Sequence, residues 1–313
     1  MNRRELLARA AALAAASAFP AAIAQAGTRR LRHESGTRIV AREPWGTLEH
    51  VGDGIWAMLS TPLVDRTTLC NGGLIAGRDG VLMIEAFGSE AGARWMSDQS
   101  LALTGRRPTH VLVTHYHADH TAGIAAATAQ GATLALTART RDLIIERNTN
   151  PPRELLAGAS IIDASRESTL DLGARRATLR PLDGHTGSDV AVSVDDGATL
   201  FAGDLVWYEM FPNFVDATPS RLSASVRALR SPALRTVIPG HGTRTDAVGL
   251  ERYMALLDAV ESAARSALAR GATAEQAGQT FRMPAGMEQW TLFNARYYER
   301  AIGAWMRELG SAG

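Results

Sequence analysis

The chain has 313 residues, of which 46% are hydrophobic and 21% are charged, a composition typical of a globular protein with one large or two modest domains. The formal net charge is +1 at pH 7, so charge indicates neither a nucleic-acid partner nor an anionic membrane. The sequence contains no lysine, which excludes mechanisms that need one, such as a Schiff base or a P-loop. Because Cys70 is the single cysteine, the chain cannot form an intramolecular disulfide.

Residues 1–26 have the composition of an export signal. The pair Arg3-Arg4 precedes an Ala- and Leu-rich run that ends in the small-x-small sequence Ala24-Gln25-Ala26. The arginine pair is similar to a twin-arginine signal, with Sec export as the alternative. The apolar run is too short and too Ala-rich for a membrane span, so we expect a periplasmic or secreted protein with no stable membrane insertion after signal removal. The competing interpretation is an amphipathic helix that stays attached.

Residues 27–45 are polar and unpatterned, and we expect an extended lead-in there. From residue 46 onward, short apolar runs alternate with turn signals, a pattern typical of strands. Strands are predicted at 55–59, 69–76, 81–84, 111–114, 133–136, 176–182, 190–194, 199–201 and 236–238. Helices are predicted at 89–103, 138–147 and 221–229. This mixture of elements over residues 46–246 indicates an α/β fold.

The pattern changes after Asp246 and predicts a C-terminal helical extension over residues 247–313. Apolar residues there recur at helical spacing, at Leu250, Tyr253, Met254, Leu257, Val260, Ala264 and Leu268. Thr273 and Gln276 have the spacing of a capping box, which predicts the start of another helix. A final helix is expected at 288–309.

Four metal-ligand side chains stand close together in the segment Thr114-His-Tyr-His-Ala-Asp-His120. They are His115, His117, Asp119 and His120. Burying three imidazoles and a carboxylate without a cation is costly, because unpaired polar groups destabilise a protein interior. Imidazole nitrogen and carboxylate oxygen are ligands that zinc takes, so this segment predicts a metal site.

Three further candidate ligands follow predicted strands. His185 lies in Gly-His-Thr-Gly-Ser, Asp204 lies in Phe-Ala-Gly-Asp, and His241 lies in Pro-Gly-His-Gly. Each has a glycine immediately before it, which we expect to let the backbone approach a metal closely.

In this order, the motifs HxHxDH, GHT, GD and PGHG resemble those of the metallo-β-lactamase superfamily over roughly residues 46–246. The resemblance implies a four-layer αββα sandwich followed by the C-terminal helical extension. It also implies that His115, His117 and His185 hold a first metal, that Asp119, His120 and His241 hold a second, and that Asp204 bridges both. The resemblance thus implies two metals per chain, and His117 favours Zn²⁺ for them, with iron or manganese as alternatives.

The resemblance implies a binuclear zinc hydrolase in which a metal-bridging hydroxide attacks the carbonyl of a small-molecule ester, thioester, lactone or lactam, with Asp119 as a proton relay. Asp204 argues against a typical class B β-lactamase, and the motifs are closer to exported hydrolases of the glyoxalase II, lactonase and quinoprotein-associated kind. One alternative is a mononuclear iron persulfide dioxygenase that uses His115, His185 and Asp204. Another is a metal-dependent accessory or binding protein of a periplasmic redox system.

The aromatic residues after Asp204 are the predicted substrate wall, with simple core packing as the alternative. They are Trp207, Tyr208, Phe211 and Phe214. The hydroxyl of Tyr208 is the candidate that hydrogen-bonds a substrate oxygen in catalysis. Glu85 occupies a strand end where the resembled family commonly has an Asp that supports a ligand. The C-terminal helices are candidates to cap the pocket.

Overall fold

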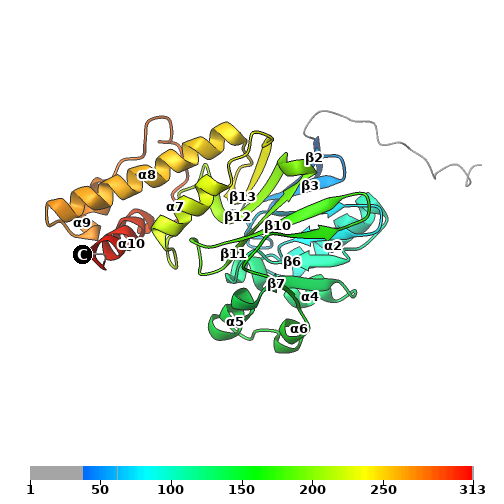
Figure 1. Cartoon of the computed structure of the whole chain (residues 1–313). Helices are drawn as coiled ribbons and strands as arrows, with labels where there is room; N and C mark the ends of the chain where they lie inside the picture. Colours follow the sequence, from blue (N-terminus) through cyan, green and yellow to red (C-terminus); the bar gives the residue numbers. More distant parts are fainter. Residues whose placement is uncertain (1–37, 62, 312–313) are drawn as a thin grey trace, which may run out of the picture. The chain divides into compact units, whose positions relative to one another are not determined.

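The computed structural model describes residues 38–61 and 63–311, and two β-sheets form its centre (Figure 1). Within these residues, the first sheet has eight strands arranged in chain order. They are β1 (Arg38–Glu43), β2 (Gly46–Gly52), β3 (Ile55–Ser60), β4 (Gly72–Ala76), β5 (Val81–Ile84), β6 (His110–Leu112), β7 (Thr133–Thr137) and β8 (Ser160–Ile162). Strands β1 to β5 pair in antiparallel fashion, whereas β5 to β8 run parallel.

The second sheet has five strands in the described part of the chain, in the order β13-β12-β11-β10-β9. They are β9 (Ser168–Asp171), β10 (Arg176–Leu182), β11 (Asp189–Val194), β12 (Thr199–Tyr208) and β13 (Thr236–Gly242). A 3₁₀ turn, η1 (Asp195–Gly197), joins β11 to β12. Strands β12 and β13 run parallel, and the other neighbours are antiparallel.

Alternation of side chains along the strands explains how the first sheet packs on both faces. In β3, Ile55 and Ala57 contribute to the core between the two sheets, whereas Trp56 and Met58 contribute to the core under the outer helices. Successive strand residues point to opposite faces, so an uninterrupted apolar run supplies two cores at once.

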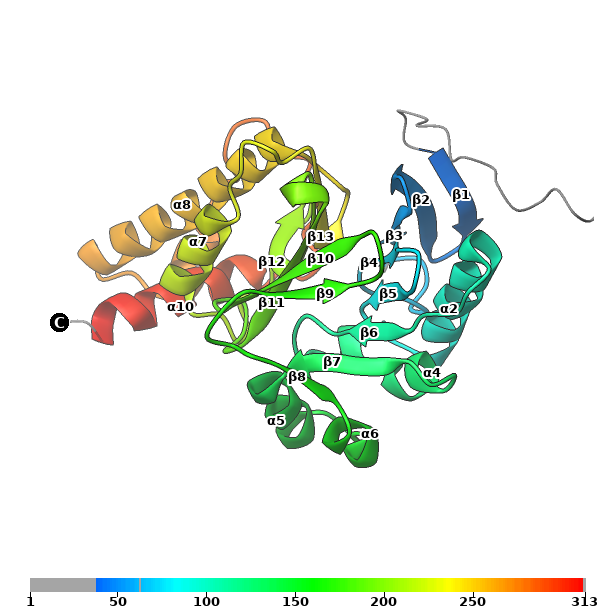
Figure 2. The same ribbon diagram turned by 45° about the vertical axis from the view of Figure 1, so that its right-hand side comes forward.

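Helices cover the outer faces of both sheets (Figure 2). On the first sheet lie α2 (Glu90–Thr104), α4 (Ile124–Thr128), α5 (Ala138–Arg147) and α6 (Arg153–Ala157). On the second lie α7 (Pro219–Ala228), α8 (Ala247–Ala269), α9 (Ala274–Thr280) and α10 (Tyr297–Ser311). The short helix α3 (Ala118–Thr121) carries predicted ligands. The expected four-layer αββα sandwich is thereby confirmed.

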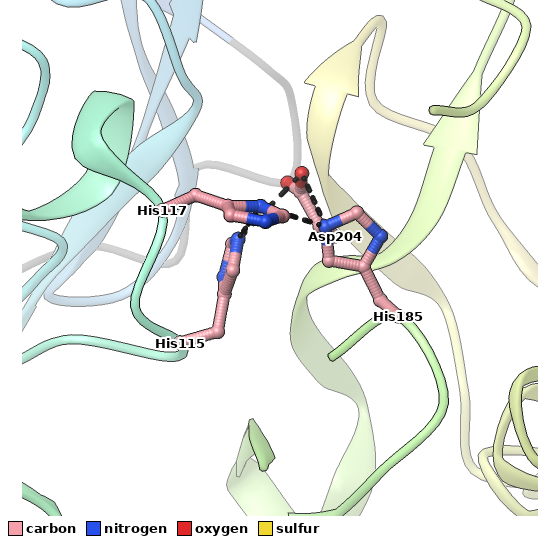
Figure 3. Close-up of side chains that lie close together, drawn as sticks. All are labelled: His115, His117, His185 and Asp204. Carbon is pink, nitrogen blue, oxygen red and sulfur yellow. Dashed lines mark hydrogen bonds and ion pairs between the residues drawn. The ribbon is translucent and has the colours of Figure 1, made fainter. Parts of the chain in front are cut away.

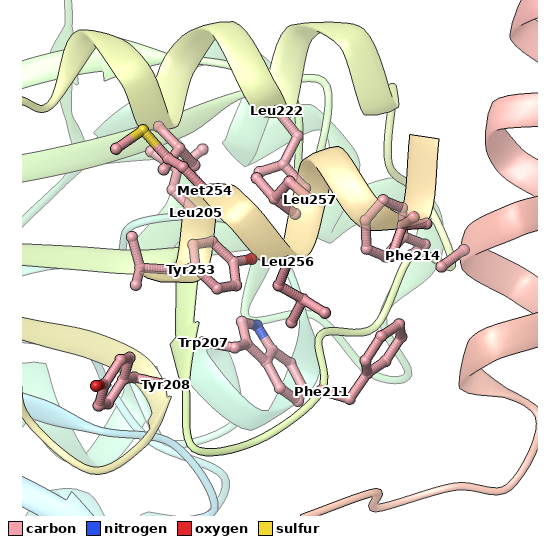
Figure 4. Packing of buried hydrophobic residues seen from close by; sticks show 14 of the residues in the cluster. Leu205, Trp207, Tyr208, Phe211, Phe214, Leu222, Tyr253, Met254, Leu256 and Leu257 are labelled. Carbon is pink, nitrogen blue, oxygen red and sulfur yellow. The ribbon is translucent and has the colours of Figure 1, made fainter. Parts of the chain in front are cut away.

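The C-terminal helices share a core with the second sheet. Tyr253 and Leu257 of α8 are buried together with Leu205 of β12 and Leu222 of α7 (Figure 4). The capping box at the start of α9 forms as predicted, because the side chain of Thr273 accepts from Gln276 N and that of Gln276 accepts from Thr273 N. The extension therefore belongs to the same compact unit as the sheets.

Several predicted boundaries change in the structure. Residues 38–43 of the expected lead-in form β1, which pairs with β2 at the edge of the first sheet. Strand β12 continues to Tyr208, well beyond the predicted 199–201, and the final helix begins only at Tyr297. The predicted export signal, residues 1–26, lies outside the described residues. In the described part of the chain, no helix combines the length and hydropathy that crossing a membrane requires.

Candidate metal centre

The structure brings all seven predicted ligands to one edge of the sandwich. His115 and His117 follow β6, Asp119 and His120 lie on α3, His185 lies between β10 and β11, Asp204 lies within β12, and His241 lies near the end of β13. Four separate segments of the chain therefore contribute to the cluster. They converge because the strands that carry them end at the same edge of the two sheets.

The first group consists of His115, His117, His185 and Asp204, whose candidate ligand atoms lie within 4.8 Å of one another (Figure 3). Nδ1 of His117 lies 3.0 Å from Nε2 of His115 and 3.1 Å from Nε2 of His185. Oδ2 of Asp204 lies 3.2 Å from Nε2 of His185. This arrangement brings together the residues predicted for the first metal.

The second group consists of Asp119, His120 and His241, again within 4.8 Å of one another. Oδ2 of Asp119 lies 3.1 Å from Nε2 of His241 and 3.6 Å from Nε2 of His120. Asp204 also reaches this group, because its Oδ1 lies 3.1 Å from Nε2 of His120 and its Oδ2 lies 3.4 Å from Nε2 of His241. Asp204 thus stands between the two groups, as a bridging ligand must.

Glu85 lies beside the Nδ1 atoms of two imidazoles, those of His115 (through Thr114) and His120. Its Oε1 accepts a hydrogen bond of 2.6 Å from the hydroxyl of Thr114, and that hydroxyl lies 3.0 Å from Nδ1 of His115. The same Oε1 lies 3.1 Å from Nδ1 of His120. Because the Thr114 hydroxyl donates to Glu85, it can accept the Nδ1 proton of His115, which leaves the Nε2 lone pair of that ring directed at the centre, as metal ligation requires.

The backbone at Glu85 is strained. Its φ of 73° lies in the left-handed region, which costs a non-glycine residue on the order of 1–2 kcal/mol. The carboxylate is almost fully buried at the end of β5. The Glu85 side chain therefore reaches both Thr114 and His120, so it can support the ligands as the Asp common in the family would.

The donor atoms fit a cation. Nε2 of His120 and Oδ1 of Asp204 are buried, and neither has a hydrogen-bond partner among the described residues, although the two atoms lie 3.1 Å apart. A buried polar atom without a partner costs about 1–3 kcal/mol. Imidazole nitrogens and carboxylate oxygens are the donors that zinc accepts, so a bound cation would satisfy both atoms.

Burial and neighbouring charges set the protonation of these groups. Burial lowers the pKa of His115 well below its ordinary value and that of His185 to about 3, so both rings are neutral. Burial alone would raise the pKa of Asp204, but the surrounding imidazoles, led by His241, hold it well below its usual range. Burial also lowers the pKa of His120 and His241, but neighbouring negative charges, Asp204 among them, outweigh it and raise the pKa of His120 well above its ordinary value and that of His241 to about 9. These two rings must therefore release a proton when a metal binds.

The glycines before three ligands make room for other segments of the protein beside these ligands. A Cβ at Gly240 would lie 1.9 Å from Oδ1 of Asp204, and one at Gly203 would lie 2.7 Å from Oγ1 of Thr114. A Cβ at Gly184 would lie 2.2 Å from the backbone nitrogen of Leu222 in α7. Each glycine therefore lets another segment approach beside a ligand.

The family can now be assigned by comparison. Residues 65–241 match the family model of the metallo-beta-lactamase superfamily. The chain belongs to this superfamily. A hydroxyacylglutathione hydrolase of Cereibacter sphaeroides is 28% identical over 143 residues, which cover 45% of this chain and 51% of that protein. The chain thus spans about half the length of this curated relative.

Solved structures of the superfamily share the fold. A metallo-beta-lactamase from Pontibacter korlensis aligns with a TM-score of 0.58 and 20% identity, over 67% of this chain and 98% of that chain. The stereoselective inverting sec-alkylsulfatase Pisa1 from a Pseudomonas species aligns with a TM-score of 0.68 and 13% identity, over 85% of this chain and 50% of that chain. At these identities the likeness shows the fold, which the metallo-beta-lactamase assignment already requires.

His117 has an outer partner that the sequence did not reveal. Its Nε2 lies 3.0 Å from Oδ2 of Asp216, a residue of the loop after β12. The hydroxyl of Tyr116 donates to the same carboxylate oxygen, and Nη1 of Arg147 donates to Oδ1 at 2.9 Å. No motif marks Asp216, because its contact with His117 exists only in the folded chain.

A cavity of about 400 Å³ opens over the candidate metal ligands. Its lining residues are Arg66, Leu69, His117, Ala118, Asp119, Asp204, Trp207, Met210, Asn213, Val215, His241, Phe293 and Tyr297. Trp207 therefore occupies the predicted substrate wall, and its ring lies 4.1 Å, between centroids, from that of His241. Phe293 and Tyr297 bring the C-terminal extension onto the cavity.

The other three residues of the predicted substrate wall are not among the lining residues. Tyr208, Phe211 and Phe214 are buried in the core under the C-terminal helices (Figure 4). The ring of Tyr208 packs against that of Trp290, and its hydroxyl lies 3.4 Å from Nη1 of Arg252. The structure therefore does not bring Tyr208 to this cavity, because the residue next to Trp207 in a strand points to the opposite face.

Proposed function

We propose that the protein is a binuclear zinc hydrolase that cleaves a small ester, thioester, lactone or lactam. The observation that carries this proposal is the pair of donor groups that share Asp204 at the floor of a cavity of about 400 Å³. Membership in the metallo-beta-lactamase superfamily and a relative named hydroxyacylglutathione hydrolase support it. A cavity of this size suits a small-molecule substrate.

Each donor group would hold one zinc ion. His115, His117 and His185 would bind the first, Asp119, His120 and His241 would bind the second, and Asp204 would contact both. Bound zinc would supply Lewis acidity toward the substrate oxygen and a hydroxide nucleophile at neutral pH. In the described part of the chain, the cavity lining contains no Ser, Thr or Cys, so no side chain of these types competes as nucleophile.

Asp119 is the residue of the centre that we assign to proton transfer. Its side chain is 30% exposed and lines the cavity, whereas that of Asp204 is 2% exposed. A carboxylate that faces both the second ligand group and the substrate space can accept a proton from the attacking water and donate it to the leaving group. Trp207 forms the adjacent wall, where its ring excludes water from one side of His241.

The decisive experiment is elemental analysis of the purified protein together with hydrolysis assays. About two zinc ions per chain and zinc-dependent turnover of an ester, thioester, lactone or lactam are the expected results. About one iron per chain with oxygen uptake on a persulfide would instead establish the dioxygenase alternative. Bound metal without turnover of any substrate would leave the accessory or binding protein as the better description.

Matched variants test whether Asp119 is needed for turnover. Asp119→Ala is expected to lower kcat by about 10²–10⁴-fold, the usual range for a positioned acid or base. Asp98→Ala, on the exposed surface of α2, is the control, since Asp98 pairs with Arg107 and does not line the cavity. Hydrolysis that survives Asp119→Ala unchanged would contradict the proposed role.

A further inference from the structure

Arg66 places a guanidinium group on the wall of the cavity. It lies in the loop between β3 and β4 and is exposed. Among the described residues it is the only permanent cation of the lining, and it forms no ion pair with any of them. An arginine that lines a cavity without an acidic partner has its hydrogen-bond donors available for a ligand.

The neighbouring carboxylate, that of Asp65, is hydrogen-bonded to Thr67 and forms no ion pair with Arg66 in the described part of the chain. Oδ1 of Asp65 accepts a hydrogen bond of 2.8 Å from the backbone nitrogen of Thr67 and a second one from the Thr67 hydroxyl. The carbonyl of Thr67 in turn accepts a 2.6 Å hydrogen bond from the hydroxyl of Ser89, which caps α2. The chain on the C-terminal side of Arg66 is therefore anchored to α2, and Asp65 is engaged in the local turn.

Most of the remaining wall is apolar. Leu69, Trp207, Met210, Val215 and Phe293 come from three separate loops and strand ends and face the same cavity. Val215 is 51% exposed and Phe293 is 43% exposed, which is high for large apolar residues beside a ligand site. Exposed apolar side chains at the mouth of a cavity are expected to be covered when an apolar ligand binds.

We propose that the substrate is an amphiphilic anion, an ester or related acyl compound with an apolar body and a carboxylate-like oxyanion that Arg66 binds. This inference rests on the proposed hydrolase function. Hydrolysis would add water across the acyl bond, breaking it to give an acid and the protonated leaving group, and the oxyanion would remain unchanged. The planar guanidinium can donate two parallel hydrogen bonds to such an oxyanion, so Arg66 would determine specificity without taking part in bond cleavage.

The test compares esters that differ only in the charged group. For the acyl side, 4-nitrophenyl octanoate is paired with mono-4-nitrophenyl suberate, and for the leaving group, 4-nitrophenyl butyrate is paired with 3-carboxy-4-nitrophenyl butyrate. We expect the zinc-loaded protein to favour the anionic member of at least one pair in kcat/KM. Arg66→Gln should lower kcat/KM for that ester by about 10–100-fold, mainly through KM, and leave its neutral partner within about twofold.

Two further variants and two contradicting outcomes complete the test. Arg66→Lys should restore part of the preference, and Arg153→Gln, on the exposed surface of α6, should change neither ester. Equal kcat/KM for both members of both pairs, or an equal loss for both in Arg66→Gln, would overturn the inference and leave the hydrolase proposal intact. Failure of the zinc-loaded protein to cleave any of the four esters would overturn the hydrolase proposal for acyl esters and this inference with it.

Discussion

Oδ2 of Asp216 lies 3.0 Å from Nε2 of His117, on the side of the ring opposite the ligand cluster. Because this carboxylate accepts the Nε2 proton, Nδ1 of His117 keeps its lone pair directed at His115 and His185. Hydrogen bonding to His117 and Tyr116 holds the pKa of Asp216 below its usual range, so the carboxylate is ionised. Asp216 is therefore a positioning residue for the first ligand group.

Removing this contact should weaken metal binding. We expect Asp216→Ala to reduce the affinity for zinc by about 10–100-fold, because the ring of His117 loses the partner that sets its tautomer and orientation. Asp216→Asn should lose less, since the amide oxygen can still accept from Nε2. Zinc affinity is measured by competition with a chromophoric chelator. Asp163→Asn, at an exposed carboxylate far from the ligands in sequence, is the control, and equal affinity in Asp216→Ala and wild type would contradict the assignment.

Gly240→Ala should disrupt the centre. The new Cβ would lie 1.9 Å from Oδ1 of Asp204 and 2.8 Å from its backbone nitrogen, so the strand that carries His241 must move away from β12. We expect less than one zinc per chain and a lower melting temperature. Gly187→Ala is the matched control beside His185, because a Cβ there meets nothing within 4 Å. Full zinc occupancy in Gly240→Ala would show that the backbone adjusts more easily than its packing suggests.

The sequence was sufficient to locate the seven candidate ligands, but not the residues that hold them in place. The ligands follow short apolar strands in recognisable motifs, and strand ends gather at one edge of a sheet. By contrast, Asp216 and Arg66 lie in loops whose positions depend on the packing of several elements, and no periodic pattern marks them. The misplaced Tyr208 shows the same limit, since the neighbour of a cavity residue in a strand faces away from it.

The fold was predictable to a similar extent. The strands 81–84 and 176–182 were predicted at their observed bounds. All four residues of the first are buried, and alternate residues at the start of the second are buried, so their apolar residues follow the pattern of a strand. Strands β1, β2, β8 and β9 were missed, and of these β1 and β9 are polar, partly exposed edge strands, which hydrophobic patterning does not reveal. Pairing with a neighbour, rather than local composition, makes these segments strands.

Asn71 is expected to be important for stability, because it links the first sheet to the segment that carries His241. Its Nδ2 donates to the carbonyls of Pro239 and Gly242, both at 2.9 Å, and its Oδ1 accepts from Ser60 N at 2.8 Å. Asn71→Ala removes three hydrogen bonds in a buried place and should lower the free energy of unfolding by about 2–4 kcal/mol. Urea denaturation of the metal-free protein measures this directly.

Asn71→Asp tests the two hydrogen bonds that Nδ2 donates separately from the one that Oδ1 accepts. It keeps the oxygen that Ser60 N needs but turns a carboxylate oxygen toward two carbonyls, so we expect a loss at least as large as that of Asn71→Ala. If Asn71→Asp were as stable as wild type, the contacts to Pro239 and Gly242 would contribute little.

Metal removal should destabilise the whole domain, because the ligands come from four segments that zinc would join. A ligand that binds only the folded state adds about 4 kcal/mol of stability at a free concentration 1,000 times its Kd. We therefore expect the melting temperature to fall when zinc is removed by chelation and to recover when zinc is returned. In Asp204→Asn the difference between the zinc-loaded and metal-free forms should be much smaller, since the residue between both groups has lost its charge. In Asp98→Asn the full difference should remain. Equal melting temperatures of wild type with and without zinc would mean that the seven side chains do not form a metal centre.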